Sequence, residues 1–339
     1  MSRRTAAEAA GVAAFLALAL LGVPALRNGY WQLVLQTSAI YTVVALSLAL
    51  LLGRVGMISL GQVALLAIGG WIALRLGFAT SMPFLLVVLV TGLLTGLLGT
   101  LIGLPALRLS GLHLALITLM FAAAITLLLE ATQFPNGGGG FLGHSVLTTA
   151  PSILRRPRFA AGDAAYYRLV VVVTALMFLL VVVHVRSRPG RAWAAIRQSE
   201  AAALAAGVNV TLYKLWALAL ASFMTGVAGG LLAASGGGLT VYQFPTQNSI
   251  ILLAVTLMGG ISSLWGPIVA GLLFEALPAL LRTWGLPSDL LIILFGVGVI
   301  QVQLTAAAGL ASQVPRDLAN LVRLLGRLAG RPRGRELSG

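Results

Sequence analysis

The side chains best placed to do chemistry lie in one polar stretch, RSRPGRAWAAIRQSEAAALAAGVNVTLY, which covers residues 186–213. It holds a single carboxylate, Glu200, preceded by four arginines: Arg186, Arg188, Arg191 and Arg197. The whole chain contains no Walker A loop, metal-ligand cluster, nucleophile elbow or carboxylate pair. We therefore predict that it is not an enzyme and holds neither a metal nor a cofactor.

A helix must position Glu200. Pro189 and Gly190 begin a run of Ala, Leu, Arg, Gln and Glu, which are strong helix formers, and Gly207 ends it. On one helix over residues 191–206, side chains turn by roughly 100° per residue, so four of them fall within about 80° of one another: Trp193, Ile196, Glu200 and Leu204. The sequence thus predicts a carboxylate inside an apolar stripe.

Two interpretations of this carboxylate remain open. In the first, the stripe docks into a groove of another protein, which supplies a cation or backbone donors to Glu200. In the second, the helix is an ordinary amphipathic connector, and Arg197 pairs with Glu200 for roughly a few tenths of a kcal/mol.

Two long apolar runs flank this stretch, YYRLVVVVTALMFLLVVVHV before it and KLWALALASFMTGVAGGLLAA after it. Each reaches the roughly 20 helical residues that cross a hydrocarbon core of about 30 Å. Basic residues near span ends are retained on the inner side of a membrane. Residues 186–213 are therefore predicted to form a cytoplasmic loop.

Composition excludes a soluble domain, since 59% of the 339 residues are hydrophobic and only 9% are charged. The net charge of +14 does not indicate nucleic-acid binding, because the basic residues are spread between apolar spans and in the tail. They are interpreted as topology signals, with attraction to anionic lipid as a secondary effect. The absence of cysteine excludes disulfides and thiolate sites. The three histidines have no ligand-like spacing: His113, His144 and His184.

These patterns predict an all-α polytopic membrane protein of about ten transmembrane helices with both termini in the cytoplasm. Residues 1–315 are expected to form a single transmembrane domain, with 131–165 as its long extracytoplasmic loop and 316–339 as a basic tail. The predicted spans lie near 11–26, 30–52, 60–76, 84–104, 109–129, 167–185, 214–234 and 249–258, followed by a ninth that contains Glu275 and a tenth near 290–304.

Residues 53–70, GRVGMISLGQVALLAIGG, are rich in glycine yet too apolar for a wet loop. Non-helical backbone at membrane depth is tolerated only where protein or a cavity covers it. We predict a broken helix here, with Ser59 and Gln62 as pore-lining donors; the alternative is that the small residues serve helix packing alone. Gly92 and Gly96 form a small-xxx-small pattern that favours close packing of another span.

A second break is predicted in GGISSLWGPIVAGLLFEALPALL. Gly259 and Gly260 should end one helix, and Trp265 and Pro267 should begin the next. Glu275 lies inside that next span, where a charge is costly and is either functional or structurally paired.

The extracytoplasmic loop contains four consecutive glycines after Pro135 and Asn136. They predict either a flexible linker or a nest of backbone donors for a carboxylate. Three arginines of this loop oppose the positive-inside trend: Arg155, Arg156 and Arg158.

Several segments also carry a family resemblance. Glu200-Ala201-Ala202 followed by Gly207, after SRPGRAWAAIRQ, resembles the EAA loop of ATP-binding-cassette (ABC) importer permeases, in the version of branched-chain amino acid permeases of the LivM type. GMISLGQ resembles their ISLGH-type segment, with Gln62 where histidine is frequent, and LPALRLSGLHLALITLMFAAA and GGISSLWGP are also similar to the family. The resemblance covers about residues 41–294 in order.

The resemblance implies an importer subunit of the bacterial inner (plasma) membrane that moves branched-chain or related amino acids by alternating access. Its implied partners are a LivH-like permease in a heterodimer, two cytosolic ATPases and a periplasmic or lipid-anchored binding protein. It implies ATPase coupling through Gly190, Arg191, Ile196, Arg197, Glu200, Ala201, Ala202 and Gly207. It also implies that six residues are candidates for the substrate path: Ser59, Gly61, Gln62, Asn136, Gly137 and Gly138.

The alternative function is an ion-coupled secondary transporter of the inverted-repeat class. GMISLGQVALLAIGG and GGISSLWGPIVAGLL are faintly alike, and broken helices fit this class too. The spans contain few ionisable residues that could carry a coupling ion, and Glu275 is the main candidate.

Overall fold

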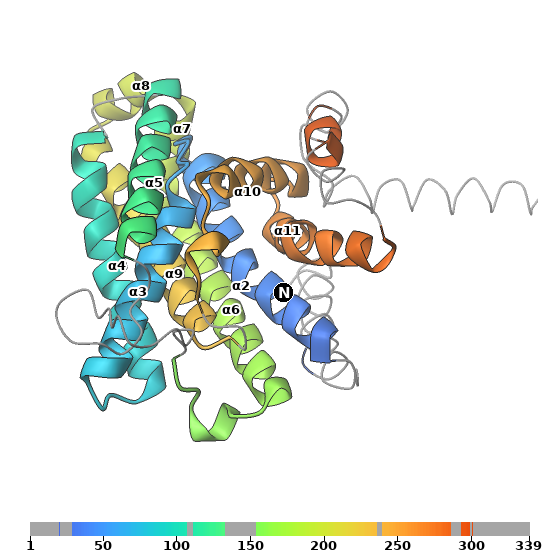
Figure 1. The fold of residues 1–339 in the computed structure, drawn as a ribbon. Coiled ribbons are helices and arrows are strands. Elements are labelled where there is room, and N and C mark those ends of the chain that lie inside the picture. The colour runs from blue at the N-terminus through green and yellow to red at the C-terminus, as the bar shows by residue number, and fades with distance from the viewer. Residues whose placement is uncertain are drawn as a thin grey trace, which may run out of the picture.

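The computed structural model of the protein describes residues 20, 29–106, 111–132, 154–235, 239–285, 293–298 and 300. The regular elements of these ranges are helices, gathered side by side in one bundle (Figure 1). Several predictions lie outside the described residues: the first span apart from residue 20, Asn136, Gly137, Gly138, the basic tail and both termini.

Seven helices of the described ranges are long and apolar enough to cross a membrane. They are α2 (Gly29–Leu50, continued to Val55), α3 (Gln62–Ala79), α4 (Phe84–Ala106), α5 (Leu112–Thr132), α6 (Asp163–Arg186), α9 (Val210–Ala233) and α11 (Gly266–Thr283). Each coincides with a predicted span, apart from a few residues at the ends. Polytopic helical architecture is thereby confirmed for the described part of the chain.

The helix at the predicted eighth span runs slightly past the predicted range 249–258 at both ends, yet it is shorter than a membrane span requires. This helix, α10 (Thr246–Gly259), has 14 residues, which at 1.5 Å per residue is about 21 Å and too short to cross a hydrocarbon core of about 30 Å alone. A polar start and a glycine stop limit its length. The predicted tenth span is described only in part, and residues 293–298 are helical there.

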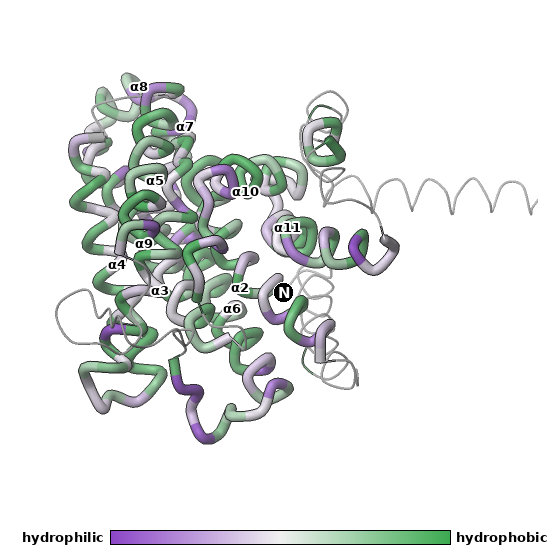
Figure 2. Tube along the Cα trace, in the orientation of Figure 1, coloured by the Kyte–Doolittle hydropathy of each residue, from purple (hydrophilic) through white to green (hydrophobic). Residues whose placement is uncertain are grey.

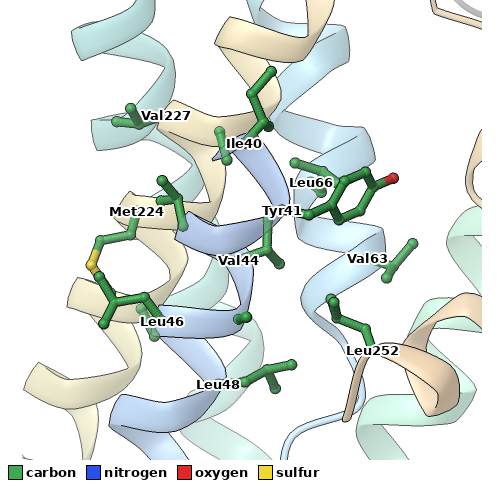
Figure 3. Packing of buried hydrophobic residues seen from close by; sticks show 14 of the residues in the cluster. Ile40, Tyr41, Val44, Leu46, Leu48, Val63, Leu66, Met224, Val227 and Leu252 are labelled. Carbon is green, nitrogen blue, oxygen red and sulfur yellow. The ribbon is translucent and has the colours of Figure 1, made fainter. Parts of the chain in front are cut away.

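The core of the bundle is built on α2, α3 and α9. In α2 and in α9, 78% of the apolar window is buried, against 22% in α5 and 28% in α6. Figure 3 shows side chains of α2, α3, α9 and α10 packed together, among them Ile40, Val44, Leu66, Met224 and Leu252. The less buried helices are apolar on their outer faces, as lipid contact requires.

Close contact between α4 and α9 confirms the small-residue pattern. A Cβ atom at Gly92 would lie 2.7 Å from Cγ2 of Val227, and one at Gly96 would lie 3.3 Å from the Ala219 carbonyl oxygen. Both glycines therefore let the two helices approach more closely than any larger residue permits.

Both predicted breaks are present. After α2 the chain forms a π-helical turn, Leu51–Val55, and then runs without helix from Gly56 to Gly61. The second break follows α10, where Gly260 adopts φ 107°, and α11 begins with Trp265 as its N-cap and proline in its first turn. These two non-helical segments are the main irregularities inside the described bundle.

Candidate coupling surface and polar core

The predicted cytoplasmic loop lies at one end of the bundle and folds into α7 (Arg188–Gln198) and α8 (Glu200–Ala205) (Figure 1). Hydrophilic residues gather there and around the segment before α6 at the other end (Figure 2). The prediction of one helix over 191–206 is wrong. The chain is extended at Ser199 (φ −163°, ψ 119°), whose Oγ accepts a hydrogen bond from the Ala202 N–H at 3.2 Å. Serine stops α7 because it caps a new helix better than it continues one.

The break at Ser199 also overturns the predicted apolar stripe. Trp193 and Ile196 are buried, and Trp193 Nε1 donates to the Tyr213 carbonyl at 2.8 Å. Leu204, in contrast, is 60% exposed. Glu200 therefore does not lie between buried apolar neighbours on one helix.

Glu200 pairs with Lys214, which lies on the next helix. Lys214 Nζ, at the start of α9, donates to Glu200 Oε1 at 2.6 Å. The lysine side chain is 8% exposed and the carboxylate side chain 50% exposed. The predicted pairing of Glu200 with Arg197 is thus wrong, and the carboxylate instead neutralises the charge of Lys214 at this end of the bundle.

Arg197 points to the first break. Its Nη1 donates to the carbonyl of Gly53, inside the π-helical turn. The next residue of that turn, Arg54, donates from Nη2 to the Ser262 carbonyl at 3.4 Å, in the second break. The predicted cytoplasmic loop and the two breaks therefore meet at one place.

The other predicted coupling residues divide into exposed and supporting positions. Arg191, Ala201 and Ala202 are exposed. Ile196 is buried behind them, and a Cβ atom at Gly190 would collide with the Val185 carbonyl, so glycine is needed for the turn from α6. Gly207 ends α8 as predicted: its N–H bonds to the Leu204 carbonyl and that of Val208 to the Ala203 carbonyl, which is a Schellman motif.

Ser59, Gly61 and Gln62 are all buried, at the start of α3. Gln62 Oε1 accepts hydrogen bonds from Thr225 Oγ1 at 2.7 Å and from Ser47 Oγ at 3.3 Å, and the two hydroxyls are 3.0 Å apart. Ser47 in α2 and Thr225 in α9 were not predicted as site residues. Their hydroxyl side chains inside otherwise apolar spans could have indicated them.

The Gln62 amide keeps one atom without a partner in this cluster. Its Nε2 is buried and makes no hydrogen bond to the described residues. Turning the amide over would let that nitrogen donate to both hydroxyls, which can donate in turn to the carbonyls of Val44 and Ala221.

Glu275 lies in α11, on the helix that packs against α2; the neighbouring Phe274 ring lies 4.5 Å from the Tyr41 ring. Neither ion pair of the described residues includes Glu275. Its predicted role, functional or structural, stays a prediction.

Arg156, one of the three arginines that opposed the positive-inside trend, has structural partners. Its Nε donates to the Ala234 carbonyl at 2.9 Å, just past the end of α9, and its Nη1 donates to Asp163 Oδ1 at 2.6 Å. Its guanidinium also lies over the Tyr166 ring, 4.5 Å from the centroid. The position of Arg156 follows from its capping of a helix C-terminus, where the backbone is negative.

Comparison with known proteins adds to this geometry. The family model described as branched-chain amino acid transport system / permease component matches residues 31–302. The chain belongs to this family. The family consists of transport permease components, not enzymes.

Two curated relatives are each 28% identical over 271 residues, which is 75% of this chain. They are the high-affinity branched-chain amino acid transport system permease proteins LivM of Salmonella typhimurium (strain LT2) and of Escherichia coli (strain K12). The chain spans 64% of the length of these relatives. No solved structure matches the chain significantly.

Proposed function

We propose that the protein is a permease subunit of an ABC importer, which moves branched-chain or related amino acids inward by alternating access. The family membership carries this proposal. It is supported by α7 and α8, which form a helical structure between the two spans α6 and α9. The buried Trp193 and the Glu200–Lys214 pair fix that structure to the bundle, so a force applied to it would reach the spans.

The proposed complex contains a LivH-like second permease, two cytosolic ATPases and a periplasmic or lipid-anchored binding protein, in a bacterial inner membrane. The ATPases are required because the chain has no nucleotide-binding motif of its own. Energy for transport would therefore come from hydrolysis on partner subunits.

The exposed side of α7 and α8 is the proposed ATPase-binding surface. Arg191, Ala201 and Ala202 offer one cation beside small side chains, which lets a partner approach the backbone closely. Ile196 and Gly190 act from behind by holding α7 in place. Glu200 contributes by fixing α8 to Lys214, with half of its side chain left for a partner.

The Ser47, Gln62 and Thr225 cluster is the proposed polar point of the substrate path, with Ser59 and Gly61 beside it and Asn136, Gly137 and Gly138 in the outer loop. The unused atom of the Gln62 amide supports this role, because an unpaired polar group in a core is costly and is usually kept for a reason. A substrate amino or carboxylate group could meet either atom of the amide.

Co-purification with candidate ATPases tests the proposal. We expect the wild type to bring down the ATPases, and Ala201→Trp to lose them, because the indole adds bulk at an exposed position of the proposed surface. Ala161→Trp is the matched control, since Ala161 is also exposed but lies at the opposite end of the bundle, before α6. Failure of the wild type to bind any co-expressed ATPase, together with uptake driven by a proton gradient alone, would favour the ion-coupled alternative.

A further inference from the structure

We propose that Gly53 and Arg54 connect α7 to the turn between α10 and α11, so that movement of α7 is passed to both breaks of the bundle. Arg54 is in this view a positioning residue for transport, acting through the backbone of another element. The inference rests on the proposed function, because it supplies the route by which an ATPase would move the spans.

The first step of the connection runs from α7 to the π-helical turn. Arg197 lies one residue after the buried Ile196, and its Nη1 donates to the Gly53 carbonyl. Because Trp193 and Ile196 are buried, α7 is held close to this turn. A displacement of α7 therefore pulls directly on the backbone of residue 53.

The second step runs from the π-helical turn to the other break. A Cβ atom at Gly53 would collide with the Ile261 carbonyl, so the two backbones are in direct contact. Arg54 Nη2 donates to the next carbonyl, that of Ser262, at 3.4 Å. Gly53 and Arg54 thus contact α7 on one side and residues 261–262 on the other.

The chemistry favours a connection that transmits movement over one that only fills space. Both guanidinium groups bond to backbone carbonyls, Arg197 to the end of α2 and Arg54 to the turn between α10 and α11, and neither has a carboxylate partner among the described residues. A bond to a carbonyl acts on the chain itself, whereas a bond to a flexible side chain would absorb the movement.

The turn that receives this pull is also able to change shape. In it the N–H groups of Gly56 and Met57 both bond to the Leu51 carbonyl. π-Helical turns are rare and occur frequently at functional sites. An element of this kind can pass between two hydrogen-bond arrangements, which is what a transmitted conformational change needs.

The test uses the complete complex, with both ATPases, the second permease and the binding protein, in lipid vesicles. Arg54→Gln is expected to keep ATPase co-purification and basal ATP hydrolysis. Uptake per ATP hydrolysed should fall about tenfold, the factor that corresponds to loss of one charge-assisted hydrogen bond. Arg54→Lys, which keeps the cation, should recover part of the uptake, and Arg158→Gln is the matched control at the far end of the bundle.

The outcomes separate this inference from the proposed function. Wild-type uptake per ATP in Arg54→Gln would overturn the connection, and so would loss of ATPase binding in that variant, since Arg54 would then only stabilise the fold. Absence of ATPases from the wild-type complex would instead overturn the importer assignment. Gly53→Ala should also uncouple hydrolysis from uptake, and retained ATPase binding would show that this variant is folded.

Discussion

Two arginines at opposite ends of the bundle both donate to backbone carbonyls, but in different surroundings. Arg156 bonds to Ala234 at the end of the regular helix α9, and it is also bonded to Asp163 and stacked on Tyr166. Arg197 bonds to Gly53 in a π-helical turn, and the charged group next to that acceptor is a second arginine, Arg54.

The difference concerns what each arginine can do. Three interactions around Arg156 act together on a helix that is regular throughout, so that end of α9 is fixed. The contact of Arg197 is single and is made to an irregular turn, so it can guide a movement at small cost in stability. We infer that one arginine serves stability and the other serves coupling, and the following predictions test this division.

Arg156→Ala is expected to have the largest effect on stability. It removes a hydrogen bond from a charged group to the Ala234 carbonyl and a cation–π contact with Tyr166, which together contribute about 3 kcal/mol to the free energy of unfolding. Denaturant unfolding in detergent micelles measures this change. Arg158→Ala, at an exposed position of the same loop, is the control and should leave stability unchanged. Equal losses of unfolding free energy in the two variants would show that Arg156 does not fix this end of α9.

Glu200→Gln should have the next largest effect, because the two members of its ion pair differ in burial. Without the carboxylate, the largely buried Lys214 has no counter-charge, which should cost about 1–2 kcal/mol of unfolding free energy. Lys214→Met leaves a carboxylate that water can solvate, so its cost should stay below about 1 kcal/mol. The same unfolding measurement compares them, and the reverse order would show that the carboxylate is the less solvated partner.

Ser199→Ala should cost about 1 kcal/mol in the local stability of α8, the usual effect of losing an N-cap. Faster amide hydrogen exchange at residues 200–205 would report the loss. Ser187→Ala is a matched control, since Ser187 precedes α7 without capping it and its hydroxyl donates to the His184 carbonyl.

Arg197→Gln should have the smallest effect on stability, about 0.5 kcal/mol, because a single bond from an exposed side chain is lost. Uptake in vesicles should nevertheless fall while ATP hydrolysis continues. A loss of stability as large as that of Arg156→Ala, with uptake retained, would remove the distinction between the two arginines.

The features that depend on local sequence were predictable. Long apolar runs predicted the spans, and paired glycines predicted the stop after α10, because both act within a few residues. Hydropathy did not distinguish α2 and α9, which are largely buried, from α5 and α6, which are not, since spans are apolar on every side in both settings.

The details of the candidate site were less predictable. The high helix propensity of residues 191–206 predicted one helix, because a single serine changes the summed propensity little. That serine nevertheless divides the segment, because one N-cap residue decides where a helix begins. The Glu200–Lys214 pair joins two elements across a bend, and helical spacing does not encode it. The meeting of Arg54 with Ser262 is a contact between residues more than two hundred positions apart, which periodicity within one element does not report.

The helix α9 is held at both of its ends, by Lys214 near its start and by Arg156 just past its last turn. With 24 residues it is a rod of about 36 Å, so a tilt of about 5° around its middle would move each end by about 1.6 Å in opposite directions. Such a displacement exceeds the range of donor–acceptor distances over which a hydrogen bond persists. Tilting α9 alone would therefore break a contact at one end. The helix can tilt only if α4, whose glycines pack against it, and the groups bonded to its two ends move with it.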